Sequence, residues 1–368
     1  MTAVASPPAT PIAPGPRLGA IPSARPARAT ALFMFLTAGL AVMVVLAASR
    51  GQLTIPAAEV IGSIMHRLGL DLGPMPTHPQ GDNTLWQVRF PRVALAILVG
   101  ASLATAGALM QGIFGNPLAE PSVVGVSAGA ALAAAIVIVF QLSFIGTWTV
   151  AFAAFIGGLV TTQLVYLLSR AGGRTEVVTL VLTGIAVNAV CSAGIALMMF
   201  LGDTQAREEI VFWQLGSLNG SRWPYVAVVA PLALVGIAGA MLMAAKLDIL
   251  SLGDRAARHL GINVERLRIG AIVLVALLTA AAVSFAGMIA FVGLVIPHLV
   301  RMITGPGHRV LVPASALGGA LLMVTADLVA RTAVAYADLP IGMLTSLVGG
   351  PFFFWLLRRT RRTAGGWA

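Results

Sequence analysis

The residues best suited to chemistry are few, and they lie in short polar stretches between long apolar runs. The turn Gly115–Pro121, GNPLAEP, combines an amide, a carboxylate and two prolines. Proline has no backbone donor and keeps the preceding residue out of the helical conformation, so this turn is sharp and stiff. Asn116 and Glu120 can hydrogen-bond backbone carbonyls or amides that lipid cannot satisfy. A plain connecting turn needs nothing so specific.

The sequence offers no residues for nucleotide hydrolysis or for a metal site. Lys246 is the only lysine, and LMAAKLD around it is not the phosphate loop G-x-x-x-x-G-K-[ST]. Cys191 is the only cysteine; we expect it to be buried and inert. His298 follows Pro297 in an apolar run, and we interpret it as a satisfied structural histidine rather than a metal ligand. We therefore predict no catalytic residue and no cofactor, so another polypeptide must hydrolyse any ATP.

The composition predicts the elements that carry these residues. The chain has 368 residues, of which 58% are hydrophobic and 10% charged, and its mean hydropathy is +0.94. Soluble proteins carry roughly 25% charged residues, so this is an integral membrane protein, and we predict an all-α fold with ten transmembrane helices. The windows are 31–49, 92–114, 122–140, 148–169, 177–201, 225–245, 269–284, 286–304, 309–331 and 340–357.

The charge distribution supports dividing 269–304 into two helices. This stretch is too long for one tilted helix, and Ser284 with Gly287 offers a break. With ten helices both termini share a side, which we assign to the cytoplasm. The inner side then holds 16 of the 23 basic residues, in agreement with the positive-inside rule. The other seven are Arg50, Arg67, Arg89, Arg92, Arg207, Arg222 and Arg331.

The two ends of the chain differ in composition from the body. Residues 1–29 are rich in Pro and Ala, and we predict a disordered basic tail. The permease domain then covers 30–360, and 361–368 form a cytoplasmic C-terminal tail. The start of the chain resembles a secretory signal, but we favour a retained first helix. The net charge of +10 follows from the flanks of the apolar spans, so we predict no nucleic-acid partner.

Small residues indicate how the helices pack. GVSAG (Gly125–Gly129) places small residues four apart, and others recur at Gly100, Gly107 and Gly184. Hydrophobic drive between helices is weak in lipid, so close backbone approach must hold the bundle together. The helix at 122–140 is therefore predicted to be an internal packing helix. The alternative is that Gly and Ala are simply frequent in membrane helices.

One cytoplasmic loop, 246–268, is long enough to bind a partner. We predict a short helix over Asp254–Leu260 that ends at Gly261, and a second short helix capped by Asn263. A surface helix of this kind can also bind acidic lipid. Its mixed charge favours a protein partner.

Five blocks in one order resemble the permease subunits of the iron-chelate and cobalamin uptake family of ATP-binding-cassette (ABC) importers. The blocks are RFPR, NPLAEPSVVGVSAGA, LGINVERLR, FVGLVIPHLVR and ADLVAR, and the resemblance covers about residues 30 to 360. It implies a homodimer with the pathway on the shared axis, two cytoplasmic ATPase subunits and a periplasmic substrate-binding protein. It also implies a bacterial inner membrane, with both termini in the cytoplasm.

The resemblance implies roles for individual residues. Arg89, Arg92 and Arg331 match positions that dock acidic groups of the binding protein. Their alternative role is snorkelling, and for Arg331 a pair with Asp327. Asn116 and Leu118 match the cytoplasmic gate. The helix that couples to the ATPase matches Ser251, Leu252, Gly253, Asp254, Arg255, Ala256, Ala257, Arg258, His259 and Leu260, with Gly261 at its end.

Several alternatives stay open at this point. The cargo is expected to be a large chelate, with haem favoured over a ferric siderophore or cobalamin because of the segment 212–223. Thr183 and Asn188 are candidate pathway residues, and we interpret His66 and His78 as solvated rather than substrate-binding. A proton- or sodium-driven transporter would need a buried coupling acid, for which Asp327 is the single candidate. A structural scaffold or receptor would show no uptake at all.

Overall fold

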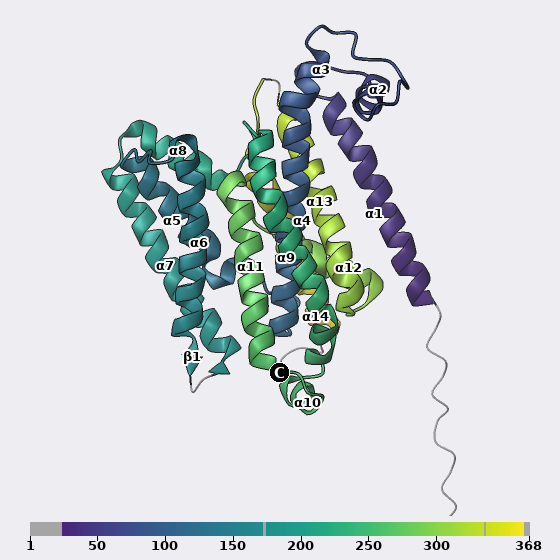
Figure 1. Ribbon diagram of the computed structural model, residues 1–368. Helices are drawn as coiled ribbons and strands as arrows, with labels where there is room; N and C mark the ends of the chain where they lie inside the picture. Colours follow the sequence, from purple (N-terminus) through teal and green to yellow (C-terminus); the bar gives the residue numbers. More distant parts are fainter. Residues whose placement is uncertain (1–23, 172–173, 335, 364–368) are drawn as a thin grey trace, which may run out of the picture.

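The computed structural model describes residues 24–171, 174–334 and 336–363, and over these residues the chain is a bundle of α-helices (Figure 1). Residues 1–23 of the predicted tail and 364–368 of the C-terminal tail lie outside the described residues. The α-helices are α1 (Ala24–Ser49), α2 (Ala57–Arg67), α3 (Gly81–Thr84), α4 (Phe90–Phe114), α5 (Val126–Val139), α6 (Thr149–Leu168), α7 (Val177–Leu201), α8 (Thr204–Leu215), α9 (Trp223–Leu250), α10 (Asp254–His259), α11 (Val264–Ala286), α12 (Val292–Thr304), α13 (His308–Thr332) and α14 (Ile341–Thr363).

Short elements join these helices. A π-helical turn, η1 (Leu85–Arg89), runs directly into α4, and two 3-10 turns are η2 (Pro121–Val124) and η3 (Gly146–Trp148). The strands β1 (Arg170–Ala171) and β2 (Arg174–Thr175) form a small antiparallel pair in which Arg170 pairs with Thr175. The described residues therefore form an almost entirely helical fold, as predicted.

Each of the ten predicted windows overlaps a helix, although α5 and α12 are shorter than their windows. Seven helical segments are long and apolar enough to cross a membrane, and three shorter apolar helices are α5, α12 and Ile341–Trp355 of α14. The break predicted near Gly287 is confirmed: α11 ends at Ala286, and α12 starts only after Phe291. Both Gly287 (φ 70°) and Phe291 (φ 67°) adopt the left-handed conformation, which ends or delays a helix.

Three helix limits in the structure differ from the predicted ones. α1 begins at Ala24, inside the predicted tail, and α14 continues to Thr363, past the predicted domain end. Asn263 does not cap a second short helix but the long α11, where its Oδ1 accepts a hydrogen bond from Arg266 N at 3.0 Å. The cause is the same in all three cases, because polar residues next to an apolar span continue the helical hydrogen bonding into the interface.

α4 is the central helix of the bundle. It packs against α9, α11, α12 and α13, and nearly all of its side chains from Val99 to Ile113 are buried. Figure 1 shows α5, α6, α7 and α8 grouped on one side of α4, while α1 lies on the other side against α13. A helix enclosed on all sides is apolar all round rather than amphipathic, and this explains why the α4 sequence has no polar face.

Close backbone approach between helices is confirmed. A Cβ atom added at Gly129 of α5 would overlap the Thr161 hydroxyl of α6, and one at Gly107 of α4 would overlap the Gly293 carbonyl of α12. α5 contacts α6, α7, α8 and α11, so it is an internal packing helix, as predicted. Packing at this distance supplies the van der Waals contact that stabilises helix association in lipid.

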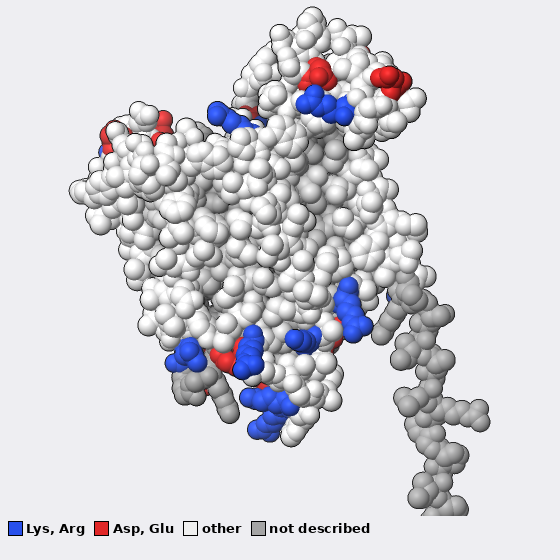
Figure 2. Space-filling model, viewed as in Figure 1, with Lys and Arg blue, Asp and Glu red and all other residues white. Residues whose placement is uncertain are grey.

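The bundle has two polar ends. We call the end that carries α2 and α3 the α2 end, and the end that carries α10 the α10 end; α1 begins at the α10 end (Figure 1). On the face shown in Figure 2, the charged side chains lie toward these two ends, and the surface between them is uncharged. An uncharged band of this kind is the surface that a lipid bilayer requires.

Candidate functional site

A cavity of about 660 Å³ lies among α4, η2, α5, α8, α11, α12 and α14, and we call it the central cavity. The irregular segment between α11 and α12 and the adjoining α14, where an added Cβ at Gly342 would be 2.5 Å from the Met288 carbonyl, form part of its wall. Most of its surface is apolar, with hydroxyl and amide groups set into it. The lining residues are Leu103, Glu120, Pro121, Ser122, Ser127, Gln214, Leu215, Thr279, Met288, Ile289, Ala290, Gly293, Gly342, Met343, Ser346, Leu347 and Pro351.

Two polar groups of the central cavity stand out. Glu120 Oε1 accepts a hydrogen bond from Phe291 N at 3.0 Å, as expected for an acid that satisfies a free backbone amide. Burial raises the pKa of the Glu120 carboxyl above its ordinary value, and the bond from Phe291 N partly opposes this. The buried Thr279 hydroxyl has no hydrogen-bond partner among the described residues.

The turn predicted to be a gate lies between α4 and the central cavity. Gly115 has a left-handed φ of 60° and ends α4. Asn116 Oδ1 then accepts a hydrogen bond from Leu118 N at 2.9 Å, which closes a tight side-chain turn. Because Glu120 and Pro121 line the cavity, this turn leads directly from the end of α4 to the cavity wall.

Neither predicted pathway residue lines the central cavity. Asn188 of α7 donates a hydrogen bond from Nδ2 to the Ser122 carbonyl at 3.3 Å. It therefore stabilises η2 and does not line the cavity. Thr183, on the same helix, is also absent from the lining. Instead Gln214 and Leu215, at the end of α8, reach the cavity, and they belong to the segment 212–223 that favoured haem.

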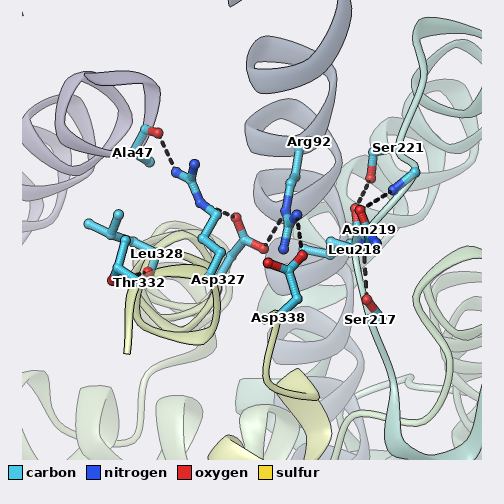
Figure 3. A network of polar contacts seen from close by, with 12 residues as sticks. Ala47, Arg92, Ser217, Leu218, Asn219, Ser221, Asp327, Leu328, Thr332 and Asp338 are labelled. Atoms are coloured by element: carbon cyan, nitrogen blue, oxygen red, sulfur yellow. Dashed lines mark hydrogen bonds and ion pairs between the residues drawn. The ribbon is translucent and has the colours of Figure 1, made fainter. Parts of the chain in front are cut away.

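Two of the three predicted docking arginines, Arg92 and Arg331, belong to an ion-pair network at the α2 end, and Figure 3 shows Arg92 between Asp327 and Asp338. Arg92 Nε lies 2.8 Å from Asp327 Oδ1, and Arg92 Nη1 lies 2.8 Å from Asp338 Oδ2. Arg331 Nε is 3.4 Å from Asp327 Oδ2, so the pair considered as an alternative exists. The Asp327 side chain is only 1% exposed, and it bridges both arginines.

Backbone carbonyls complete this network. Arg331 donates to the carbonyls of Arg50 and Ala47, and Arg89 donates to those of Ala48 and Leu53. The end of α1 and the residues after it are thereby tied to the junction of η1 and α4 and to the end of α13. Asp338 was not predicted, although an acid two residues before Pro340, at the start of the last apolar window, was a visible signal.

The segment predicted to couple to an ATPase projects from the α10 end. The predicted short helix is confirmed as α10, and Gly253 (φ 99°) and Gly261 (φ 82°) flank it in left-handed conformations. Leu252 and Leu260 are exposed, while Ala257 is buried against the bundle. Asp254 is paired with Arg268 at 2.9 Å.

A second contact ties this segment to the bundle and was not predicted. Asp248 Oδ1, two turns before α10, accepts a hydrogen bond from His308 N at 2.6 Å and lies 2.8 Å from His308 Nδ1. The other face of the buried imidazole lies against Gly112 of α4, where an added Cβ would be 2.8 Å from Nε2. His308 therefore joins the ends of α9, α13 and α4.

The remaining histidines have local roles in the described residues. His66 Nδ1 lies 3.2 Å from Asp71 and its Nε2 lies 3.1 Å from the Gly73 carbonyl, so both nitrogens are engaged within the α2–α3 loop. His78 Nδ1 accepts a hydrogen bond from Gln80 N. His298 was predicted to be satisfied, but its buried Nδ1 has no partner among the described residues.

Comparison with known proteins identifies the family. The model of the FecCD transport family matches residues 29–359. The chain belongs to the FecCD transport family. It is therefore a membrane permease of the ABC transporter class.

Relatives of this FecCD-family chain span several cargoes. The hemin transport system permease protein HmuU of Yersinia pestis is 43% identical over 286 residues, which cover 77% of this chain and 85% of HmuU. The cobalamin import system permease protein BtuC of Halobacterium salinarum is 42% identical over 271 residues, or 74% and 72% of the two chains. A solved metal-chelate type ABC transporter in an inward-facing conformation has a TM-score of 0.78 and 32% identity, and the match covers 90% of this chain and 99% of that chain.

Proposed function

We propose that this permease imports a large metal chelate, with haem favoured, from a periplasmic binding protein into the cytoplasm. The observation that carries the proposal is the central cavity, which is apolar, carries scattered hydroxyls and has the stiff Asn116 turn at its wall. A chelate with a broad organic surface suits such a lining better than a bare ion does, because a bare ion needs closely spaced charged or carbonyl ligands.

The proposed assembly has two copies of the chain, each with ten crossings of the bacterial inner membrane. Seven long helices and three shorter apolar ones account for ten crossings, with the α10 end in the cytoplasm. Two separate ATPase subunits bind the 251–261 segment, and their closure on ATP moves it. The Asn116–Leu118 turn is the inner gate, and Arg89, Arg92 and Arg331 form the outer docking site.

Two observations favour haem over other chelates: one segment of the sequence and one relative. Residues 212–223 contribute Gln214 and Leu215 to the central cavity, and HmuU is 43% identical to this chain. A ferric siderophore or cobalamin is the second candidate, because BtuC is 42% identical.

The test is reconstitution of the permease in proteoliposomes with its ATPase and binding protein. We expect ATP-dependent accumulation, and stimulation of ATPase activity that is strongest with haemin, compared with a ferric hydroxamate and cobalamin. Uptake should survive a protonophore and stop when ATP is depleted. The reverse result would support a proton-driven transporter that uses Asp327, and absence of any uptake would support a scaffold or receptor.

A further inference from the structure

A second cavity, at the α2 end, is built around the arginines, and we call it the outer cavity. Its volume is about 530 Å³. Three of the side chains that line it are arginines, and a single one is an acid. The lining residues are Gly51, Gln52, Leu53, Thr84, Val88, Arg89, Arg92, Asn219, Arg331, Tyr336, Ala337 and Asp338.

The three arginines of the outer cavity are held in different ways. Arg89 and Arg331 donate to backbone carbonyls, which fix them to the end of α1 and to the segment after it. Arg92 is held by the carboxylates of Asp327 and Asp338, each at 2.8 Å. With three guanidinium groups and two carboxylates, this cluster has a net charge of +1, and it attracts a further acidic group.

The two carboxylates on Arg92 are not equivalent. The Asp327 side chain is 1% exposed and lies under the cluster, whereas that of Asp338 is 33% exposed and reaches Arg92 from the loop before α14 (Figure 3). A protein that approaches from outside therefore meets Asp338 first. Any carboxylate that it brings to Arg92 Nη1 has to take the place that Asp338 occupies.

We propose that Asp338 is an internal competitor for docking, which occupies Arg92 until an acidic side chain of the binding protein replaces it. This inference rests on the proposed docking of that protein through Arg92. One carboxylate exchanges for another, so Arg92 is never left buried and unpaired, which would be strongly unfavourable. This exchange makes docking specific for proteins with an acidic side chain at this point, because a neutral surface forms no ion pair with Arg92 when it displaces Asp338.

The exchange also reaches the central cavity. Asp338 lies three residues before Ile341, whose N–H donates to the Gly216 carbonyl at 3.0 Å, and an added Cβ at Gly342 would be 2.6 Å from the Leu215 carbonyl. Further along α14, Met343 and Leu347 line the central cavity. Release of Asp338 would remove one of the contacts that hold the start of this segment, while the bonds from Leu339 N to the Ala330 carbonyl and from Ile341 N to the Gly216 carbonyl keep it joined to the cavity wall.

Strain and exposure mark the same loop. Tyr336 has a φ of 62°, which is uncommon for a residue with a bulky side chain, and it is 92% exposed beside the arginines. An exposed tyrosine next to a desolvated charge pair is a frequent anchor in protein interfaces. Tyr336 and Asp338 are two residues apart. A docked protein that covers Tyr336 therefore lies close enough to displace Asp338.

The test measures the affinity of the full-length permease in nanodiscs for its binding protein. Asp338→Asn removes the competing charge, and we expect the Kd to fall about fivefold to tenfold. Asp338→Glu keeps a carboxylate and should bind like the wild type. Asp71→Asn is the matched control, because it removes an acid from the same end that is 96% exposed and paired with His66, away from the arginines; its Kd should stay within twofold.

Four outcomes would overturn the inference. An equal gain for Asp338→Asn and Asp71→Asn would mean that net charge alone acts, and weaker binding of Asp338→Asn would mean that Asp338 positions Arg92 for the partner. Unchanged binding of Asp338→Asn, with the wild type binding normally, would reject the competition and leave the proposed docking intact. If the wild type binds no such protein, the docking proposal itself fails, and the inference fails with it.

Discussion

The two ends of the bundle use charge in opposite ways. At the α2 end, Arg92, Arg331 and Asp327 are buried and paired with one another, whereas at the α10 end Asp254 and Arg258 are 3.7 Å apart and well exposed. Exposed pairs contribute about 0–1 kcal/mol, and breaking a buried pair costs about 3–5 kcal/mol. The Asp327 pairs of the α2 end therefore contribute to folding as well as to the proposed docking, whereas the exposed Asp254–Arg258 pair of the α10 end contributes little to stability.

The strongest test of this difference replaces the shared acid at the α2 end. Asp327→Ala leaves Arg92 and Arg331 without the carboxylate that joins them, and we expect the free energy of unfolding to fall by about 3–5 kcal/mol. Arg258→Ala at the α10 end should cost less than about 1 kcal/mol. Denaturant unfolding in detergent measures both, and equal losses would contradict the comparison.

The next test asks whether Asp248, at the α10 end, stabilises the fold through its contact with His308. Asp248→Asn weakens two hydrogen bonds to His308, and we expect a loss of about 1–2 kcal/mol and less uptake per ATP hydrolysed. Asp203→Ala is the control, because it removes the side-chain cap of α8 at a cost of about 1 kcal/mol. If both variants lower uptake per ATP equally, reduced stability rather than the His308 junction is the cause.

An effect of similar size on folding is expected at the glycine that follows α10. Gly261 has φ 82° with open space around it, so Gly261→Val costs about 1–2 kcal/mol through the backbone alone. We expect a folded protein that hydrolyses ATP in the complex but imports less. Gly69→Val provides the control, since Gly69 has φ 79° and open space in the loop after α2. Unchanged uptake by Gly261→Val would count against the coupling role.

The smallest effect on stability is expected for an exposed leucine. Leu252→Ala should change the free energy of unfolding by less than about 0.5 kcal/mol, yet weaken ATPase binding about fivefold to tenfold, which corresponds to ~1 kcal/mol. Leu72→Ala, at the α2 end and similarly exposed, should leave ATPase binding unchanged. A titration of detergent-solubilised permease with its ATPase gives both values. If both variants weakened ATPase binding equally, the ATPase would not bind specifically at the α10 end.

Much of the fold was predictable because its causes are local. Each span must be apolar over about 20 residues, and each turn needs residues that end a helix, so windows, Gly287 and the 254–260 helix were visible in the sequence. The small residues of GVSAG indicated close helix packing, because the size of a side chain can be read directly from the sequence. The family resemblance was visible for the same reason, because its blocks are short stretches of sequence.

The partners of the buried charges were decided by the tertiary structure. Arg92 and Asp338 are 246 residues apart, and Asp248 and His308 are 60 apart. No local pattern sets such pairs, because they depend on which helices pack side by side around α4. The same holds for the central cavity, where α8, α11 and α14 meet, and for Asn188, which the packing directs to Ser122 instead. The sequence shows which charged and polar side chains need a partner once they are buried. The packing of the helices determines which residue becomes that partner.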